Sequence, residues 1–212
     1  MLAISHRGYN GPDNSKKAFQ NAIQANFDVI ETDVHKTFDN KLLLIHDRFV
    51  GPYDVEATYS NVLQNYDKSI LTLEEFFQYF SANTYKIYLD IKGSNETAHL
   101  LIHFLKSHYI ETTNLFIAST NRNHLQTCLH SGLNLKLGLI TFNTFLSTEL
   151  GYILQHVDFI VVDIECLSQD YVKTLKTHNR KIFVYTCKKE CHYEFIKPFK
   201  VDGIISDILL DL

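Results

Sequence analysis

Short apolar runs alternate with longer stretches of helical periodicity along the whole chain, and this alternation limits the folds that the chain can adopt. When a strand is followed by a helix and then by another strand, the strands form a parallel sheet with the helices packed outside it. The candidate strands are 2–5, 29–34, 42–45, 86–91, 115–118, 136–140, 159–163 and 181–186.

Two of the stretches between these strands begin with residues that are typical of helix N-caps. Ser15, after Asn14, precedes apolar residues at helical spacing, and Thr72 precedes a second set. A third set runs from Leu100 to Leu105. Eight strand–helix units predict an α/β fold, namely a (β/α)8 TIM barrel with a closed parallel sheet and outer helices. A ninth apolar run at 202–207 is either the closing strand or an accessory one, and both remain open.

The length of 212 residues, 45% of them hydrophobic, is enough for one sizeable core. Because no linker, repeat or low-complexity tract divides the chain, we expect a single domain over residues 1–212. The long connection at 48–70 is expected to overhang the functional site, as long loops in compact domains often do.

The formal charge of −4, from 20 basic and 24 acidic residues, argues against nucleic acid or an anionic membrane as a partner. The N-terminus does not resemble a signal peptide, and no apolar stretch is long enough to span a bilayer. The four cysteines lack metal or redox spacing, so we expect mostly buried free thiols. Together these features predict a cytoplasmic protein.

Two carboxylates, Glu31 and Asp33, lie two residues apart in a candidate strand and therefore leave the same face. In a dry interior they would repel each other and lose hydration, and a divalent cation would remove both costs. Asp90 and Lys92 repeat the spacing on another strand. Three carboxylates suit Mg²⁺ or Ca²⁺. The structural alternative is a salt-bridge network that also includes Arg7.

Two histidines, His6 and His46, each end a candidate strand. Cleavage of a phosphodiester needs one group that accepts a proton from the attacking oxygen and another that donates one to the leaving oxygen. Imidazole serves in both roles near neutral pH. Arg7 can hold two phosphate oxygens and Lys92 adds a compact charge, so this set predicts a metal-assisted phosphodiesterase.

In order and spacing, these residues closely resemble the glycerophosphodiester phosphodiesterase family. The resemblance covers essentially the whole chain. The motifs that carry it are His6-Arg7-Gly8, Pro12-Asp13-Asn14-Ser15, Glu31-x-Asp33-Val34, His46-Asp47, Leu73-Glu74-Glu75, Asp90-Ile91-Lys92, Tyr185-Thr186 and the segment 201–207.

The resemblance implies a barrel enzyme that hydrolyses glycerophosphodiesters to sn-glycerol 3-phosphate and an alcohol. Carried over by position, the metal ligands are Glu31, Asp33 and Asp90, the acid/base pair is His6 and His46, and the phosphate contacts are Arg7 and Lys92.

Three departures from the family pattern leave substrate choice open. Asp90 stands where the family usually has glutamate and resembles the related sphingomyelinase D-type phospholipases. The chain has no tryptophan, so Tyr185 is expected to line the substrate pocket in place of the usual C-terminal one. The segment after His46 is shorter than the family's usual insertion.

Three other functions remain alternatives at this point. The nearest is a phospholipase D- or sphingomyelinase D-like enzyme that acts on phospholipid or lysophospholipid head groups. A non-catalytic phosphate-binding scaffold would not require both histidines. A zinc site built from His6, His46 and Glu31 is the third possibility.

Overall fold

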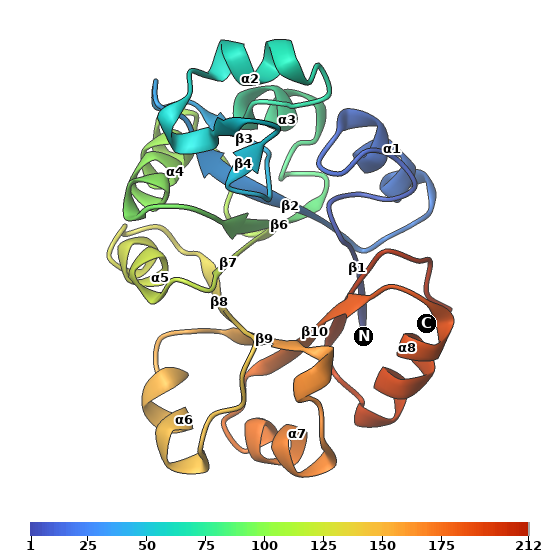
Figure 1. Cartoon of the computed structure of the whole chain (residues 1–212). Coiled ribbons are helices and arrows are strands. Elements are labelled where there is room, and N and C mark those ends of the chain that lie inside the picture. Colours follow the sequence, from blue (N-terminus) through green and yellow to red (C-terminus); the bar gives the residue numbers. More distant parts are fainter. Residues whose placement is uncertain (212) are drawn as a thin grey trace.

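Eight parallel strands close into a barrel with helices around it in the computed structural model, which describes residues 1–211 (Figure 1). Around the barrel the order is β1, β2, β6, β7, β8, β9, β10 and β11, and β11 pairs with β1 to close the circle. The predicted (β/α)8 TIM barrel is therefore confirmed. The barrel strands are β1 (Leu2–Ser5), β2 (Val29–Lys36), β6 (Lys86–Ile91), β7 (Leu115–Ser119), β8 (Lys136–Thr141), β9 (Phe159–Asp163), β10 (Lys181–Cys187) and β11 (Gly203–Ser206).

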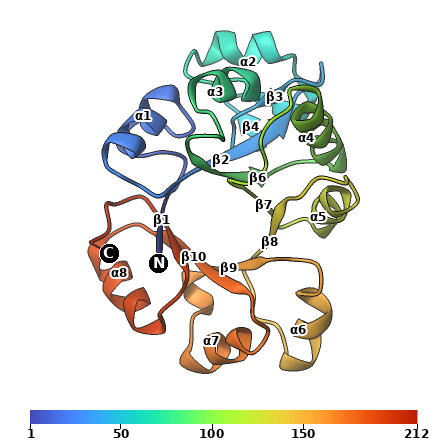
Figure 2. The same cartoon turned by 180° about the vertical axis from the view of Figure 1, so that it is seen from behind.

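Helices surround the barrel on the outside, as the view from behind also shows (Figure 2). Ser15 caps α1 by accepting a hydrogen bond from the Ala18 N–H, and Thr72 forms a capping box with Glu75 at the start of α3. Both predicted helix starts are confirmed. The helices are α1 (Lys16–Gln24), α2 (Ser60–Tyr66), α3 (Leu73–Tyr79), α4 (Asn95–Ser107), α5 (Arg122–Leu129), α6 (Ser147–Ile153), α7 (Gln169–Lys176) and α8 (Glu190–Ile196), with the short 3₁₀ helices η1 (Val55–Ala57), η2 (Ile164–Cys166) and η3 (Lys197–Phe199).

One of the eight predicted barrel strands is wrong. The run 42–45 contains only β3 (Leu42–Leu43), which pairs antiparallel with the end of β2 and lies outside the barrel. The closing strand is β11, within the ninth run that the sequence left undecided. An apolar run is buried both in a barrel strand and in a short strand outside the barrel. Its periodicity therefore does not show which of the two it forms.

The segment between β3 and α3 forms a small insertion with a hydrophobic cluster of its own. It contains β4 (Phe49–Val50), β5 (Tyr53–Asp54), η1 and α2. The cluster comprises Leu43, Ile45, Val55, Leu63 and Ile70. Within residues 1–211, none of the residues 48–70 lines the pocket described below.

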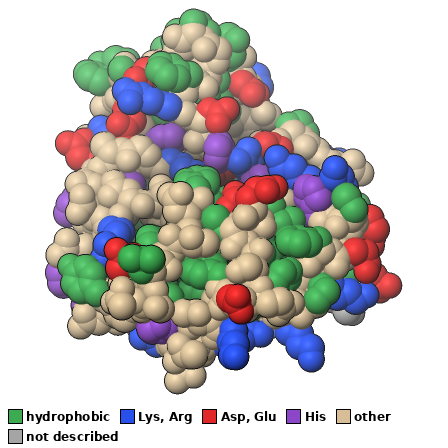
Figure 3. Space-filling view, turned by 60° about the horizontal axis from the view of Figure 1, so that its bottom comes forward, with side chains coloured by type: hydrophobic (Ala, Val, Ile, Leu, Met, Phe, Trp, Pro, Cys, Tyr) green, Lys and Arg blue, Asp and Glu red, His purple; other side chains and the backbone are tan. Residues whose placement is uncertain are grey.

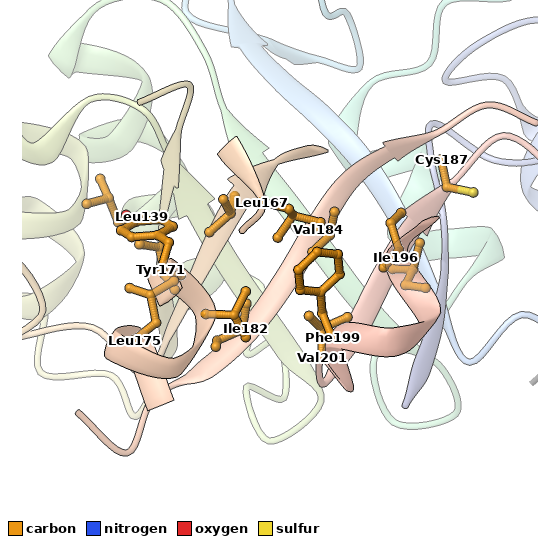
Figure 4. Packing of buried hydrophobic residues seen from close by; sticks show 14 of the residues in the cluster. Leu139, Leu167, Tyr171, Leu175, Ile182, Val184, Cys187, Ile196, Phe199 and Val201 are labelled. Atoms are coloured by element: carbon orange, nitrogen blue, oxygen red, sulfur yellow. The ribbon is translucent and has the colours of Figure 1, made fainter. Parts of the chain in front are cut away.

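Alternating side chains of the barrel strands fill an inner core and an outer core. The inner core includes Ile4, Tyr88, Phe116, Phe159 and Phe183. Outer clusters fill the space between strands and helices, and Figure 4 shows the part in which side chains of β10 lie beside those of α7 and α8.

The four cysteines are free thiols, as predicted, although only Cys128 and Cys187 are buried. None of the helices within residues 1–211 is both long and apolar enough to cross a lipid bilayer.

The inner core predicts an asymmetric response to two glycine substitutions. A Cβ at Gly138 on β8 would overlap the ring of Phe159, whereas a Cβ at Gly151 on α6 would meet open space. We expect Gly138→Ala to lower the free energy of unfolding by about 1–3 kcal/mol through overpacking. Gly151→Ala should leave it unchanged or raise it by up to about 1 kcal/mol, because alanine favours helix. Urea denaturation of both variants measures the difference, and equal stabilities would contradict this packing.

Candidate active site

One pocket at the carboxyl ends of the barrel strands is lined by all eight residues that the sequence singled out. Figure 3 shows histidine and basic side chains gathered in a hollow of this face, with acidic and hydrophobic side chains nearby. The cavity has a volume of about 110 Å³. The eight residues are His6, Arg7, Glu31, Asp33, His46, Asp90, Lys92 and Tyr185.

Parallel pairing of β2 with β6 brings the three carboxylates together. The register sets Asp33 opposite Asp90, and Glu31 lies two residues before Asp33 on the same face of β2. Oxygen atoms of all three lie within 4.8 Å of one another, and all three residues are buried. The expected carboxylate cluster is therefore present.

Two cationic side chains offset part of this negative charge. The Lys92 ammonium lies 2.6 Å from Asp90 Oδ2 and 3.2 Å from Asp33 Oδ1. The Arg7 guanidinium approaches Asp33 with Nε 3.2 Å from Oδ2. Ion pairs of the predicted salt-bridge network therefore exist, but two cations do not balance three carboxylates.

Burial and mutual repulsion perturb the carboxyl groups in different directions. Burial raises the pKa of Glu31 well above its usual range, and the charges of Asp33 and Asp90 raise it further. Burial also raises the pKa of Asp90 to about 7, against the opposing effect of Lys92. Burial acts on Asp33 too, but Lys92 and Arg7 outweigh it and lower its pKa. The protein alone therefore does not stabilise three ionised carboxylates.

This donor set fits a hard divalent cation. Asp90 Oδ1 is buried and has no hydrogen-bond partner among residues 1–211, so it is available as a ligand. Carboxylate oxygens are the preferred ligands of Mg²⁺ and Ca²⁺. Within residues 1–211 this is the one group of three such side chains close enough to share an ion. Since neither histidine belongs to it, the zinc alternative is not supported.

A tight turn after β1 places Arg7 at the pocket. Arg7 adopts a left-handed conformation with φ 56°, and Gly8 follows with φ 94°. In this turn the Arg7 backbone N–H donates a 2.7 Å hydrogen bond to Glu31 Oε2. A Cβ at Gly8 would overlap Ala18, so the turn requires glycine there for both reasons.

Each imidazole is held by a carboxylate. His6 Nδ1 lies 2.6 Å from Asp207 Oδ1, and His46 Nδ1 lies 2.6 Å from Asp47 Oδ1. Because Nδ1 of each ring is engaged by a carboxylate, Nε2 is the ring nitrogen left to exchange a proton with a ligand.

Two aromatic side chains form one wall of the pocket. Tyr185, near the end of β10, donates a 3.3 Å hydrogen bond to the Thr141 carbonyl. Its ring meets that of Phe142 edge-on, with centroids 5.9 Å apart. Tyr185 lines the pocket as predicted, whereas Phe142 was not singled out from the sequence.

Sequence analysis missed several residues that hold or line the site. Asn14, read only as part of a helix start and a motif, is buried and donates to Asp33 Oδ2 at 2.9 Å. Its side-chain oxygen also accepts a hydrogen bond from the Thr32 hydroxyl at 2.8 Å. Asp207 lay in the C-terminal motif without an assigned role. Tyr88 was not singled out, because it stands between Ile87 and Leu89 in a strand where only Asp90 was read as functional.

The chain is similar in sequence to several known proteins. A Mycoplasma genitalium uncharacterized protein is 49% identical over 49 residues, which are 22% of this chain and 20% of that protein. A glycerophosphodiester phosphodiesterase of Caldanaerobacter subterraneus is 26% identical over 97% of this chain and 93% of its own length.

Among solved structures, an Oleispira antarctica phosphodiesterase in complex with the product sn-glycerol-3-phosphate shares the fold. It has a TM-score of 0.86 and 19% identity over 99% of this chain and 94% of that one. The model of the glycerophosphoryl diester phosphodiesterase family matches residues 6–209. The chain therefore belongs to the glycerophosphoryl diester phosphodiesterase family, a family of enzymes, as its motifs predicted.

Proposed function

We propose that this protein hydrolyses glycerophosphodiesters to glycerol 3-phosphate and an alcohol, with Mg²⁺ or Ca²⁺ held by the three carboxylates. The observation that carries the proposal is the convergence, in one pocket, of two carboxylate-bound imidazoles with the three carboxylates and two cationic side chains. Family membership and the glycerophosphodiester phosphodiesterase of Caldanaerobacter subterraneus support the substrate class.

In this proposal His6 and His46 move the protons. An oxygen nucleophile, either water or a neighbouring hydroxyl of the substrate, forms a bond to phosphorus while its proton passes to Nε2 of one imidazole. The bond from phosphorus to the alcohol oxygen breaks, and the other imidazolium supplies the proton that this oxygen needs. Asp207 and Asp47 stabilise whichever imidazole is charged.

Arg7 and Lys92 bind the phosphate and neutralise the negative charge that grows on its oxygens. Both already contact Asp33, which fixes their positions before substrate arrives. A divalent cation, when bound to Glu31, Asp33 and Asp90, supplies Lewis-acid polarisation of a phosphate oxygen.

The sphingomyelinase D-like alternative is not favoured. Its one signal in the sequence is Asp90, and the comparisons are with glycerophosphodiester phosphodiesterases. The cavity of about 110 Å³ is also well below the roughly 300–1,000 Å³ of pockets for drug-sized ligands, which fits a small polar substrate.

We also propose that residues 1–212 act as one catalytic domain in the cytoplasm. One family model spans residues 6–209, and four free thiols fit a reducing compartment.

Removing either imidazole should abolish turnover without unfolding the protein. We expect His6→Ala and His46→Ala each to lower kcat for glycerophosphocholine by about 10²–10⁴-fold, because each removes a proton-transfer group. His99→Ala, on the exposed face of α4, is the matched control and should keep wild-type kcat. Near-normal turnover in either site variant would reject the two-histidine scheme, and an inactive wild type would favour a phosphate-binding scaffold.

Cation binding should be visible as stabilisation as well as activity. EDTA should stop turnover, and Mg²⁺ or Ca²⁺ should restore it. A cation at 100 times its Kd should stabilise the wild type by about 2.7 kcal/mol, which raises the melting temperature. Glu31→Gln should lose this shift, whereas Glu96→Gln, at an exposed position on α4, should retain it.

The pH dependence of cation binding follows from the pKa of Asp90. Because this pKa is raised to about 7, a proton competes with the cation below pH 7 and the carboxylate is free above it. The apparent affinity for Mg²⁺ or Ca²⁺ should therefore fall as the pH decreases from 8 to 6. Calorimetric titration at several pH values measures this, and a pH-independent affinity would contradict a site that includes Asp90.

A further inference from the structure

The Tyr88 hydroxyl is a buried polar group that the scheme above does not use. Tyr88 is 1% exposed and lies on β6, two residues before Asp90. Its hydroxyl oxygen has no hydrogen-bond partner within the residues that the structure describes, yet the side chain lines the pocket. Buried hydroxyl groups are almost always hydrogen-bonded, so this one requires a partner from outside the protein.

The surroundings of Tyr88 show what kind of group can bind there. The register sets Tyr88 opposite Glu31, one strand position deeper in the barrel than the Asp33–Asp90 pair on that face. The neighbouring pocket walls are apolar, and they comprise Ile140, Val161 and Ile205. A tyrosine hydroxyl can donate one hydrogen bond, so Tyr88 offers a donor to a group in this part of the pocket.

A phosphate group is a poor ligand at this depth. Arg7 and Lys92, the groups proposed to bind the phosphate, follow the ends of β1 and β6. The apolar walls one strand position deeper would not repay the desolvation of a charged phosphate. A neutral fragment with methylene groups and a hydroxyl oxygen matches both the apolar walls and the free donor. The glycerol part of the proposed substrate is such a fragment.

We propose that the Tyr88 hydroxyl donates a hydrogen bond to a hydroxyl oxygen of the glycerol moiety, which makes Tyr88 a specificity-determining residue for glycerol-bearing phosphodiesters. This inference rests on the proposed function. Tyr185 does not do the same, because its hydroxyl is already bonded to the Thr141 carbonyl. A ligand with the same length but no hydroxyl groups would leave the Tyr88 hydroxyl without a partner.

The test compares sn-glycerol 3-phosphate with n-propyl phosphate, which lacks the hydroxyl groups. Both are titrated calorimetrically into wild type and Tyr88→Phe in excess Mg²⁺. We expect the wild type to bind sn-glycerol 3-phosphate about tenfold more tightly than n-propyl phosphate. A difference of this size corresponds to one buried hydrogen bond between neutral groups. Tyr88→Phe should bind the two ligands equally, with the affinity for n-propyl phosphate unchanged.

Tyr193→Phe is the matched control for loss of a buried tyrosine hydroxyl. Tyr193 is 3% exposed on α8, and its hydroxyl donates to the Asp211 carbonyl at 2.6 Å. This variant should retain the wild-type preference. The ligand-free melting temperature of Tyr88→Phe should be unchanged or higher, since the substitution removes an unpartnered buried polar atom.

Four results would overturn the inference: no preference in the wild type, a preference that persists in Tyr88→Phe, an equal loss of affinity for both ligands, or a lower ligand-free melting temperature. An equal loss would mean that Tyr88 acts through the cation site. Failure of the proposed function is a separate observation, namely absence of glycerophosphocholine turnover by the wild type. The binding preference is measured without turnover.

Discussion

Strand pairing between β2 and β6 holds Asp33 opposite Asp90, and the chemistry of the pocket depends on that register. Both strands are hydrogen-bonded on each side within a closed sheet. The carboxylates therefore cannot reduce their repulsion by moving apart. A slip by one residue would turn Glu31 and Asp33 to the outer face. The inner core, in which Val29 and Phe116 pack, stabilises the register and therefore the cluster.

The loop between β1 and α1 provides the groups that keep this cluster in place. Arg7 donates through its backbone N–H to Glu31 and pairs with Asp33 through its guanidinium. Asn14 binds both Asp33 and Thr32, and it adopts a left-handed conformation that asparagine tolerates. The contacts from Arg7 and Asn14 favour the ionised form of Asp33, and the Arg7 N–H opposes part of the effect of burial on Glu31, so the loop belongs to the site.

Two tyrosines in the pocket differ in whether their hydroxyl groups are already hydrogen-bonded within the protein. The Tyr185 hydroxyl is bonded to the backbone, and its ring forms a wall with Phe142. The Tyr88 hydroxyl and Asp90 Oδ1 are buried without a hydrogen-bond partner in the part of the chain that the structure describes. Within residues 1–211, Arg7 Nε is a third pocket atom that is buried without a hydrogen bond. Unpartnered polar atoms lower the stability of the free protein, and a pocket that retains them is suited to a ligand that supplies the missing bonds.

Local features of the sequence determined much of this protein. Strand–helix alternation predicted the barrel, Ser15 and Thr72 predicted helix starts, and the i, i+2 pairs Glu31/Asp33 and Asp90/Lys92 predicted charged groups on one strand face. These inferences succeed because they need only two regularities. Side chains alternate between the faces of a strand, and functional groups of a parallel barrel gather at the carboxyl ends of its strands.

Only the tertiary structure decided the features that depend on long-range packing. It placed Leu42 in a short antiparallel strand outside the barrel and gave closure of the barrel to β11, because an apolar run is equally hydrophobic in either position. It paired His6 with Asp207, 201 residues away, and left the Tyr88 hydroxyl without a hydrogen bond to any described residue. A hydrogen-bond partner, or the lack of one, is a property of folded neighbours, and no local pattern of residues specifies it.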